Sequence, residues 1–268
     1  MSTISTRSAA IRQPGQGVRN VVRFNWDFYA VGSVAAGLGS VGLLGWGHWL
    51  PDAVQWLGWL GIGAGLYLLL ASLLVSWWVY DAAPLYRWQW VPAFLGRNPK
   101  LPLRALNIHS GFDESSRTLR QLFPTSSWQS ADLFHSLPQR EKSIIRARQL
   151  YPPDGSAQPA APHQLPYSTA DFAVVALLFA AHELRAARQR RELLAEVRRV
   201  LQPGGQLVLV EHVRDAANTL AFGPGVFHFF GAREWERAAA EVGLQLQKTQ
   251  RHTPFVRAWV FTAPTTAL

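Results

Sequence analysis

Two pairs of carboxylate and imidazole side chains stand where the chain could perform acid–base chemistry. His182 and Glu183 follow the apolar run DFAVVALLFAA, and Glu211 and His212 follow the apolar run QLVLV. An imidazole with its ordinary pKa near 6.5 can accept a proton from a hydroxyl or phenol at neutral pH. If both runs are parallel strands, both pairs lie at the carboxyl edge of one sheet, where open α/β sheets bind ligands. A solvated helix start and a polar strand end fit these residues equally well, so the sequence leaves those structural alternatives open.

The remaining residue types favour no other reaction class. The chain has no cysteine, which excludes disulfides, thiolate metal sites and cysteine nucleophiles. The sequence contains neither a Gly-x-Ser-x-Gly elbow nor a Walker loop. We expect no metal site, because no two histidines show the His-x-x-x-His or His-x-Glu spacing of a helical ligand pair. The histidines considered are His109, His135, His182, His212 and His228.

An alternation of strands and helices must position these side chains. From about residue 103, short apolar runs alternate with amphipathic helices, which is typical of a parallel sheet covered on both faces. Ser136 and Gln139 can form a capping box at one helix start, and a turn at Thr253-Pro254 predicts an antiparallel closing hairpin. The expected strands are 104–109, 128–133, one within 159–165, 172–179, 206–211, 245–251 and 256–262, and the expected helices are 114–122, 137–150, 188–201 and 232–242.

Two long apolar segments precede this alternation. Residues 28–50 and 54–80 both exceed the roughly 20 residues that a helix needs to cross a ~30 Å hydrocarbon layer. Tryptophans gather near the segment ends, as at a membrane interface, and basic residues flank the pair but are absent from the connecting turn. We therefore expect a transmembrane hairpin in the inner (cytoplasmic) membrane, with both termini cytoplasmic. The flanking residues are Arg7, Arg12, Arg19, Arg23, Arg87, Arg97, Lys100 and Arg104.

These features divide the chain into four expected parts. They are a flexible basic tail (1–24), the transmembrane hairpin (25–80), a juxtamembrane linker along the membrane surface (81–102) and an α/β domain (103–268). The flanking basic residues supply much of the net charge of +9, so we expect the lipid bilayer, and not nucleic acid, as a partner. Glycines spaced four apart allow the hairpin helices to pack on each other or on a membrane-protein partner.

Three stretches of the α/β domain resemble a known family. DFAVVALLFAAHEL, LLAEVRRVLQPGGQLVLVEHVRD and FHFFGAREWERAAAEVGLQLQKTQ are similar, in that order, to parts of class I S-adenosylmethionine-dependent methyltransferases. The resemblance is nearest to the quinone-biosynthesis type, methyltransferase type 11, and covers about residues 103–263. It implies a Rossmann-like sheet, mostly parallel with an antiparallel closing hairpin, and S-adenosylmethionine as cofactor. The chain would be a divergent, membrane-anchored member.

The resemblance places part of a cofactor site on the turn after the first strand. The family's acidic-x-Gly-x-Gly-x-Gly pattern falls on Asn107, His109, Gly111 and Asp113, where only Gly111 matches. Asn107 cannot supply the carboxylate, and side chains at the first and third glycine positions would crowd the usual close approach of the backbone to the cofactor. The turn therefore fits either a variant cofactor site or a turn that no longer binds the cofactor.

The resemblance assigns roles to five further residues. Asp132 falls where the family's ribose-binding acid ends the second strand, although it also fits a helix entry. Phe179 falls just after the fourth strand, at the lip of the site, and joins the implied cofactor-binding set. The implied catalytic residues, which would align or deprotonate an acceptor, are His182, Glu183 and His212.

The apolar loop AFGPGVFHFF, residues 221–230, lies where the family covers its acceptor. Its apolar character beside a membrane anchor indicates a lipophilic small-molecule acceptor, although the loop equally suits packing against the juxtamembrane segment. We predict a membrane-anchored S-adenosylmethionine-dependent methyltransferase that acts on a lipophilic or amphiphilic acceptor at the cytoplasmic face. The altered glycine turn favours an alternative, a non-catalytic methyltransferase-like subunit that acts as an assembly or interaction partner in a membrane complex.

Overall fold

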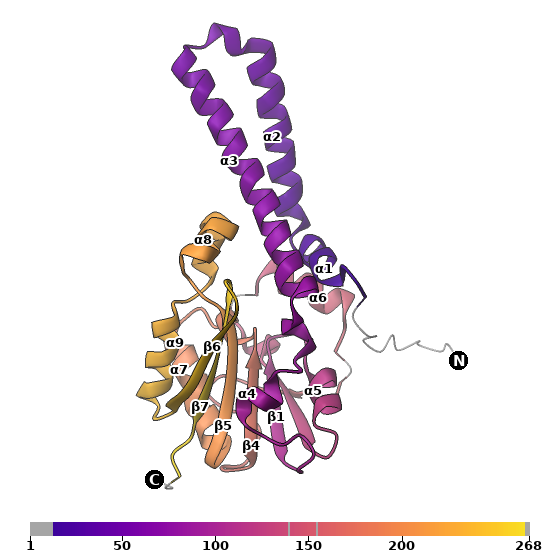
Figure 1. Cartoon of the computed structure of the whole chain (residues 1–268), viewed down its shortest axis with the longest axis vertical. Coiled ribbons are helices and arrows are strands. Elements are labelled where there is room, and N and C mark those ends of the chain that lie inside the picture. Colours follow the sequence, from indigo (N-terminus) through magenta and orange to yellow (C-terminus); the bar gives the residue numbers. More distant parts are fainter. Residues whose placement is uncertain (1–12, 139, 154, 266–268) are drawn as a thin grey trace, which may run out of the picture.

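A seven-stranded sheet with the strand order β3-β2-β1-β4-β5-β7-β6 forms the centre of the protein (Figure 1). The structure is a computed structural model that describes residues 13–138, 140–153 and 155–265. The first five strands pair in parallel, and β7 is antiparallel to β5 and β6. The predicted Rossmann-like sheet with an antiparallel closing hairpin is confirmed. The strands are β1 (Arg104–His109), β2 (Ser127–Asp132), β3 (Gln158–Pro159), β4 (Phe172–Leu178), β5 (Leu201–His212), β6 (Gln245–Thr253) and β7 (Val256–Thr262).

Helices cover both faces of the sheet, which is why its central strands are apolar without alternation. In β4, Val175 and Leu177 belong to one buried cluster with residues of α7 (Ala187–Val200) and α9 (Ala232–Glu241). Val174 and Ala176 belong to a second cluster on the opposite face. Because successive side chains of a strand point to opposite faces, one strand serves both cores. The other helices of this domain are α5 (Ser116–Leu122), α6 (Lys142–Leu150) and α8 (Ala216–Phe222).

Most expected elements have boundaries close to those observed, but α6 begins five residues later than the expected residue 137. Residues Phe134–Ser136 form a 3-10 turn instead, and the Ser136 hydroxyl donates to the carbonyls of Leu133 and Ala160 at 2.8 and 2.9 Å. The expected capping box at Ser136 is therefore wrong in this respect, and its partner Gln139 lies outside the described residues. The third strand is shorter than expected and overlaps its predicted range only at Pro159.

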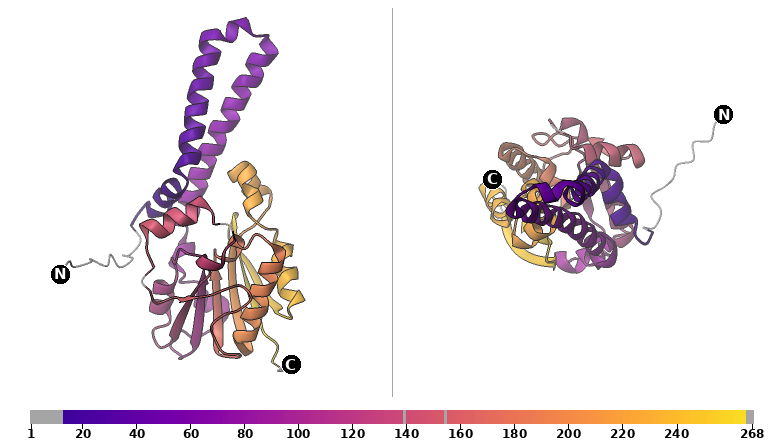
Figure 2. Two further views of the ribbon diagram at one scale, coloured as in Figure 1. Left: turned by 180° about the vertical axis from the view of Figure 1, so that it is seen from behind. Right: turned by 90° about the horizontal axis from the view of Figure 1, so that it is seen from above.

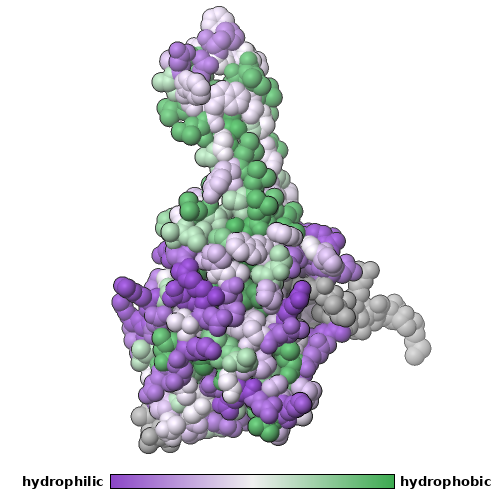
Figure 3. Space-filling model, viewed as in Figure 1, coloured by the Kyte–Doolittle hydropathy of each residue, from purple (hydrophilic) through white to green (hydrophobic). Residues whose placement is uncertain are grey.

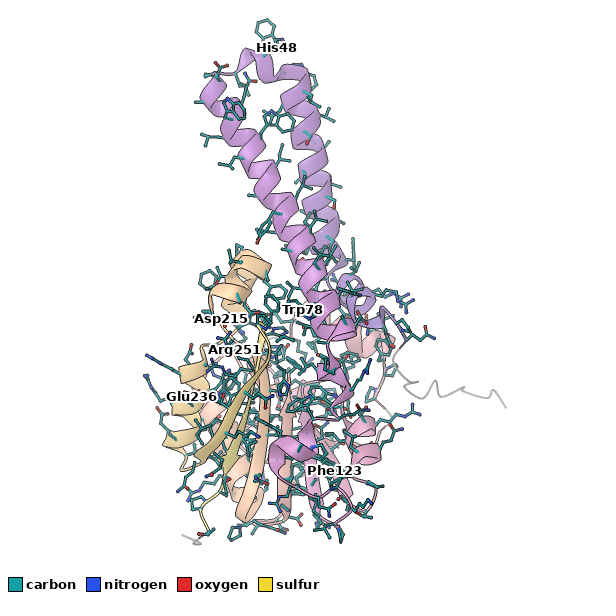
Figure 4. The ribbon with its side chains drawn as sticks, in the orientation of Figure 1. His48, Trp78, Phe123, Asp215, Glu236 and Arg251 are labelled. Carbon is teal, nitrogen blue, oxygen red and sulfur yellow. The ribbon has the colours of Figure 1, made fainter. Side chains whose placement is uncertain are left out.

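The apolar hairpin projects from the domain as two long helices, α2 (Trp26–Trp46) and α3 (Asp52–Trp77) (Figure 2). By length and composition both could cross a membrane, and almost none of their apolar surface is buried within the protein. His48 marks the far tip of the hairpin and Trp78 its foot (Figure 4). The surface of the hairpin is largely apolar, whereas the domain beneath it is mainly hydrophilic (Figure 3).

The segment after the hairpin differs from its expectation as a linker along the membrane surface. It forms a π-helical turn (Trp78–Ala82), a 3-10 turn (Pro84–Arg87) and the short helix α4 (Val91–Leu95). Leu85 and Trp88 are each 1 % exposed, and they join the buried cluster on the face of the sheet opposite α7. These apolar side chains cover the part of that sheet face that α5 does not cover. The domain therefore begins before residue 103. Trp88, one of the tryptophans that follow the second apolar segment and were expected at a membrane interface, is a core residue instead.

The N-terminal segment also differs from a flexible tail, because Gln16–Phe24 forms helix α1. The backbone N–H groups of Gly17 and Val18 both donate to the Asp81 carboxylate at 2.8 Å. This carboxylate satisfies free N–H groups at the positive end of the helix dipole. The expected flanking residues Arg7 and Arg12 lie outside the described residues.

Candidate active site

The carboxyl edge of the parallel strands faces the foot of the hairpin (Figure 1). Strand β1 ends there at His109, β2 at Asp132 and β5 at His212. The neighbouring loops add Gly111 after β1 and His182 after β4. The parallel pairing thus brings the residues predicted for the cofactor and for the acceptor to one edge of the sheet, as expected for an open α/β sheet.

The turn after β1 is held by its own polar groups. Asp113 accepts the N–H groups of Ser115 and Ser116 at 3.1 and 2.9 Å, and so satisfies free N–H groups at the start of α5. Asn107 donates its amide to the Ser116 hydroxyl at 2.8 Å. The Asn107 Oδ1 and the His109 Nε2 are buried, and neither has a hydrogen-bond partner within residues 13–138, 140–153 and 155–265. Asp113 thus has a structural role here, while two orphaned polar atoms remain within the turn.

Gly111 retains the backbone freedom that the turn requires. Its φ is +104°, in the region that side chains disfavour, and a Cβ at this position would lie 2.5 Å from the Phe134 ring. The close neighbour is therefore a side chain of this protein. Phe134 stands where the backbone of a glycine turn would otherwise approach a ligand.

Asp132 ends β2 where the resemblance requires a ribose-binding acid, but both of its oxygens are engaged. Arg148 of α6 donates to Oδ2 at 2.6 Å, and the Phe134 N–H donates to Oδ1 at 3.0 Å. The His109 imidazole, 6 % exposed, lies 3.6 Å from Oδ1. The Arg148 guanidinium also lies over the Phe134 ring, 4.4 Å from its centroid. This carboxylate is thus paired within the protein, as a buried charge must be.

Three aromatic rings cover this part of the edge. Phe24 of α1 meets Phe112 of the glycine turn edge to face at 5.4 Å, and Tyr151 contacts both rings. The Tyr151 hydroxyl donates to Asn20 of α1 at 2.8 Å. Helix α1, which leads into the hairpin, therefore covers the turn that the resemblance assigns to the cofactor.

These residues fit S-adenosylmethionine in part. Asp132 ends β2, where the resemblance requires the ribose-binding acid, and Gly111 keeps the positive φ of the turn. The unpaired polar atoms of Asn107 and His109 could bind polar groups of the cofactor. However, Arg148 must release Asp132 before a ribose diol can bind that carboxylate, and His109 and Phe134 must make room. The crevice as folded is closed by side chains of the protein itself.

The second half of the edge is a cluster centred on His182, which lies just after β4. Its Nδ1 is 2.6 Å from Glu211 Oε2, and its Nε2 is 3.4 Å from Glu183 Oε1. Burial by itself lowers the pKa of His182, but the charges of Glu211 and Glu183 outweigh it and raise the pKa to about 10. The imidazole is consequently a cation at neutral pH. The role of His182 as a general base stays a prediction. It requires that the imidazolium first lose one of its two ring protons.

His212 has a different environment. Burial lowers its pKa to about 4, so the ring is neutral. Its Nδ1 lies 3.2 Å from the Phe255 carbonyl and so carries the proton, which leaves Nε2 to accept the Tyr80 hydroxyl at 2.9 Å. Because Tyr80 belongs to the foot of the hairpin, the strand end and the membrane-facing segment share this hydrogen bond. His212 therefore positions these elements, and its assignment as a catalytic residue remains a prediction.

Phe179 occupies the lip between these groups. It adopts a positive φ of 55°, which is strained for an aromatic residue, and strained backbone clusters at functional sites. Its ring stacks on Tyr86 with centroids 5.3 Å apart and lies beside His212 at the same separation. Phe179 thus contacts the acceptor side of the edge, and no described contact joins it to Asp132.

Three residues of the site were missed by the sequence-based assignment. Arg148 lies on an amphipathic helix, and nothing in its spacing distinguishes it from a solvated arginine. Tyr80 had been placed at the end of a membrane span. His228 lies 45 residues after Glu183 but reaches within 3.9 Å of its carboxylate. A local spacing rule cannot find contacts of this kind, because they depend on the fold.

The comparisons with known proteins agree with this architecture. Residues 129–209 match the family model described as "Methyltransferase domain". A solved S-adenosylmethionine-dependent methyltransferase from Aquifex aeolicus is similar at a TM-score of 0.51 and 14 % identity, covering 68 % of this chain and 93 % of that one. An S-adenosylmethionine-dependent methyltransferase from Methanosarcina mazei has a TM-score of 0.48 and 14 % identity, with coverage of 66 % and 97 %.

The fold is that of the class I S-adenosylmethionine-dependent methyltransferases. The matched family model and this methyltransferase fold support S-adenosylmethionine as the cofactor. A methyltransferase also binds an acceptor, for which the cluster around His182 is the candidate region. No curated protein matches the sequence.

Proposed function

We propose that the chain is a membrane-anchored S-adenosylmethionine-dependent methyltransferase that acts on a lipophilic or amphiphilic acceptor at the cytoplasmic face of the inner membrane. The bound cofactor supplies an electrophilic methyl group, which leaves little covalent chemistry to side chains beyond positioning and proton transfer. One observation carries the proposal. The Asp132 carboxylate and the cluster of His182, Glu183 and Glu211 lie at the same edge of the sheet, and this edge faces the foot of the hairpin (Figure 1).

The hairpin supports the membrane part of the proposal. Its two helices are long, apolar and almost entirely exposed, unlike the core helices of a soluble protein. Helix α8 stands close to α3, since a Cβ at Gly223 would lie 2.9 Å from Leu68. Leu220 and Phe227, 64 % and 67 % exposed, extend the apolar surface from the hairpin toward the candidate acceptor region. An amphiphilic acceptor held in lipid would thus have a short path to the sheet edge.

A second function is favoured by the closed crevice. Arg148 and the Phe134 N–H engage both oxygens of Asp132, so this carboxylate is paired without a cofactor. In that case the domain would be a non-catalytic subunit of a membrane complex, and its exposed apolar hairpin would contact a membrane-protein partner.

Binding of the cofactor separates the two functions. Isothermal titration of the full chain in detergent with S-adenosylmethionine and S-adenosylhomocysteine is expected to show micromolar binding. Asp132→Asn is expected to weaken it at least tenfold, about 1.4 kcal/mol. The matched control is Asp171→Asn, because Asp171 pairs with Arg104 at the opposite, amino end of the strands. A folded chain that binds neither compound at millimolar concentration would establish the non-catalytic function instead.

A further inference from the structure

Two imidazoles and one carboxylate converge on the acceptor side of the sheet edge. His182, Glu183 and His228 each present a ligand atom, and these atoms lie within 4.8 Å of one another. His182 and Glu183 come from the turn after β4, whereas His228 comes from the 3-10 turn Gly223–His228 after α8. We propose that these three side chains form a binding site for a divalent transition-metal ion of the zinc type.

The state of Glu183 is a separate observation that points to a ligand. The residue is 4 % exposed, and its Oε2 is buried with no hydrogen-bond partner among the residues that the structure describes. Its Oε1 lies 3.4 Å from His182 Nε2 and 3.9 Å from His228 Nε2. Burying a carboxylate with an oxygen left unpaired is costly, and coordination of a cation is a usual compensation.

The separations suit a small metal ion. Zinc binds imidazole nitrogen and carboxylate oxygen at about 2.0–2.2 Å in tetrahedral geometry, which places neighbouring ligand atoms roughly 3.4 Å apart. The His182 nitrogen already stands at 3.4 Å from Glu183, whereas the His228 nitrogen, at 3.9 Å from Glu183 and within 4.8 Å of the other ligand atoms, must move inward. His228 can make this movement because its side chain is 31 % exposed.

Neighbouring hydrogen bonds fix the orientation of these ligands, as in known metal sites. Glu211 accepts from His182 Nδ1 at 2.6 Å and from the backbone N–H groups of Ala181 and His182 at 2.8 and 3.2 Å. A metal ion would take the place of the proton on Nε2, which faces Glu183, while Glu211 keeps the proton on Nδ1, an arrangement typical of metal-bound histidine. Arg185 donates to the backbone carbonyls of His182 and His228 and so ties the two ligand-bearing turns together.

A set of two histidines and one glutamate leaves a coordination position open. Such a set is typical of catalytic zinc sites, in which a water or substrate oxygen takes the fourth position. Imidazole and carboxylate ligands without sulfur also suit ferrous iron, which metal analysis would distinguish. The open position would hold an acceptor oxygen if the proposed methyl transfer is correct, but metal binding itself does not require the cofactor.

Metal binding can be tested on the full chain in detergent, purified without a polyhistidine tag. Titration with Co²⁺, followed by its visible absorption and by competition with Zn²⁺, is expected to give one ion per chain. His228→Ala and Glu183→Gln are each expected to weaken binding at least tenfold, and Glu211→Gln by about 10- to 100-fold through loss of ligand orientation. His135→Ala removes an exposed imidazole from the β2 end of the same edge and should change nothing.

Three results would overturn the proposal. They are a wild-type chain that binds neither ion at millimolar concentration, a stoichiometry unaffected by His228→Ala, and equal affinities in the Glu183→Gln and His135→Ala variants. Melting curves of each metal-free variant establish that it is folded. Because the readout is metal alone, a failure here is distinct from a failure of cofactor binding.

Discussion

At the residue scale, Arg148 controls access to the Asp132 carboxylate. Replacing it as Arg148→Gln removes the guanidinium that the ribose diol would have to displace. We expect affinity for S-adenosylmethionine to rise by roughly three- to tenfold, because the binding-competent state no longer has to be released from an ion pair. Isothermal titration measures the change.

The control for this variant is Arg140→Gln. Arg140 also lies over the Phe134 ring, but it donates to backbone carbonyls and not to Asp132. Weaker cofactor binding by Arg148→Gln than by this control would show that the guanidinium itself contacts the cofactor.

Gly111 is the second residue with a measurable consequence. Gly111→Ala adds a Cβ 2.5 Å from Phe134 at a φ of +104°. We expect the free energy of unfolding to fall by about 1–2 kcal/mol because of the backbone conformation, and by about 1–3 kcal/mol because of the overpacking against Phe134. Gly96→Ala provides the comparison, since Gly96 has a φ of +64° but open space around its Cβ position. Equal decreases in melting temperature for the two variants would mean that the Phe134 contact relaxes without cost.

At the element scale, Glu196 ties helix α7 to the segment before β4. It accepts from Arg199 at 2.7 Å and from the Leu165 N–H at 2.7 Å. The Arg199 hydrogen bond, helped by the Leu165 N–H, lowers the pKa of Glu196 below its ordinary value of 4.5. A lowered folded-state pKa contributes stability that is present above pH 4.5 and is lost as the pH falls below it.

Glu196→Gln should therefore lower the melting temperature at pH 7. Below pH 5, the melting temperature of this variant should fall less steeply with pH than that of the wild type. The change in the free energy of unfolding is expected to be roughly 1 kcal/mol or less, because the Glu196–Arg199 pair is partly exposed to solvent. Glu192→Gln serves as the control, since Glu192 pairs only with Arg188 on the same helix among the described contacts. A pH dependence identical in wild type and Glu196→Gln would contradict the linkage.

At the scale of the whole molecule, the first helices of the chain contact α6, the helix that also carries Arg148. Arg146 of α6 binds both oxygens of Asp27 at 2.7 and 3.1 Å and the Phe24 carbonyl at 2.7 Å. Arg146→Met should increase amide hydrogen exchange in α1 and α6, because it removes this bidentate pair. Lys142→Met is the control, since Lys142 is exposed and stands 4.0 Å from the same carboxylate. Unchanged exchange in α1 would show that the aromatic contacts of Phe24 suffice to hold it.

The absence of cysteine permits a direct test of the proposed membrane topology. Asp52→Cys places the one thiol of the chain in the hairpin turn, and Gln247→Cys places it on the exposed strand β6. In sealed inner-membrane vesicles with the cytoplasmic face outward, an impermeant maleimide should label Gln247→Cys and leave Asp52→Cys unlabelled until detergent is added. Labelling of both without detergent would contradict a spanning hairpin.

The sequence alone determined the order and type of most elements, because apolar periodicity reports which faces are buried. It predicted β4, α7, β5 and α9 and the antiparallel closing hairpin, and the altered turn at Asn107 and His109 was evident from residue types. It also identified the two long apolar helices, whose exposure the structure then displayed.

Only the tertiary structure decided how side chains from distant segments meet. Residues 81–102 were expected to be a linker along the membrane surface, but Leu85, Trp88 and Val91 belong to the buried cluster on one face of the sheet. The pairing of Arg148 with Asp132 and the approach of His228 to Glu183 follow from parallel strands that end at one edge, which brings together side chains 16 and 45 positions apart. Periodicity describes burial along one element, whereas a site is defined by distances between elements, and those distances exist only once the chain has folded.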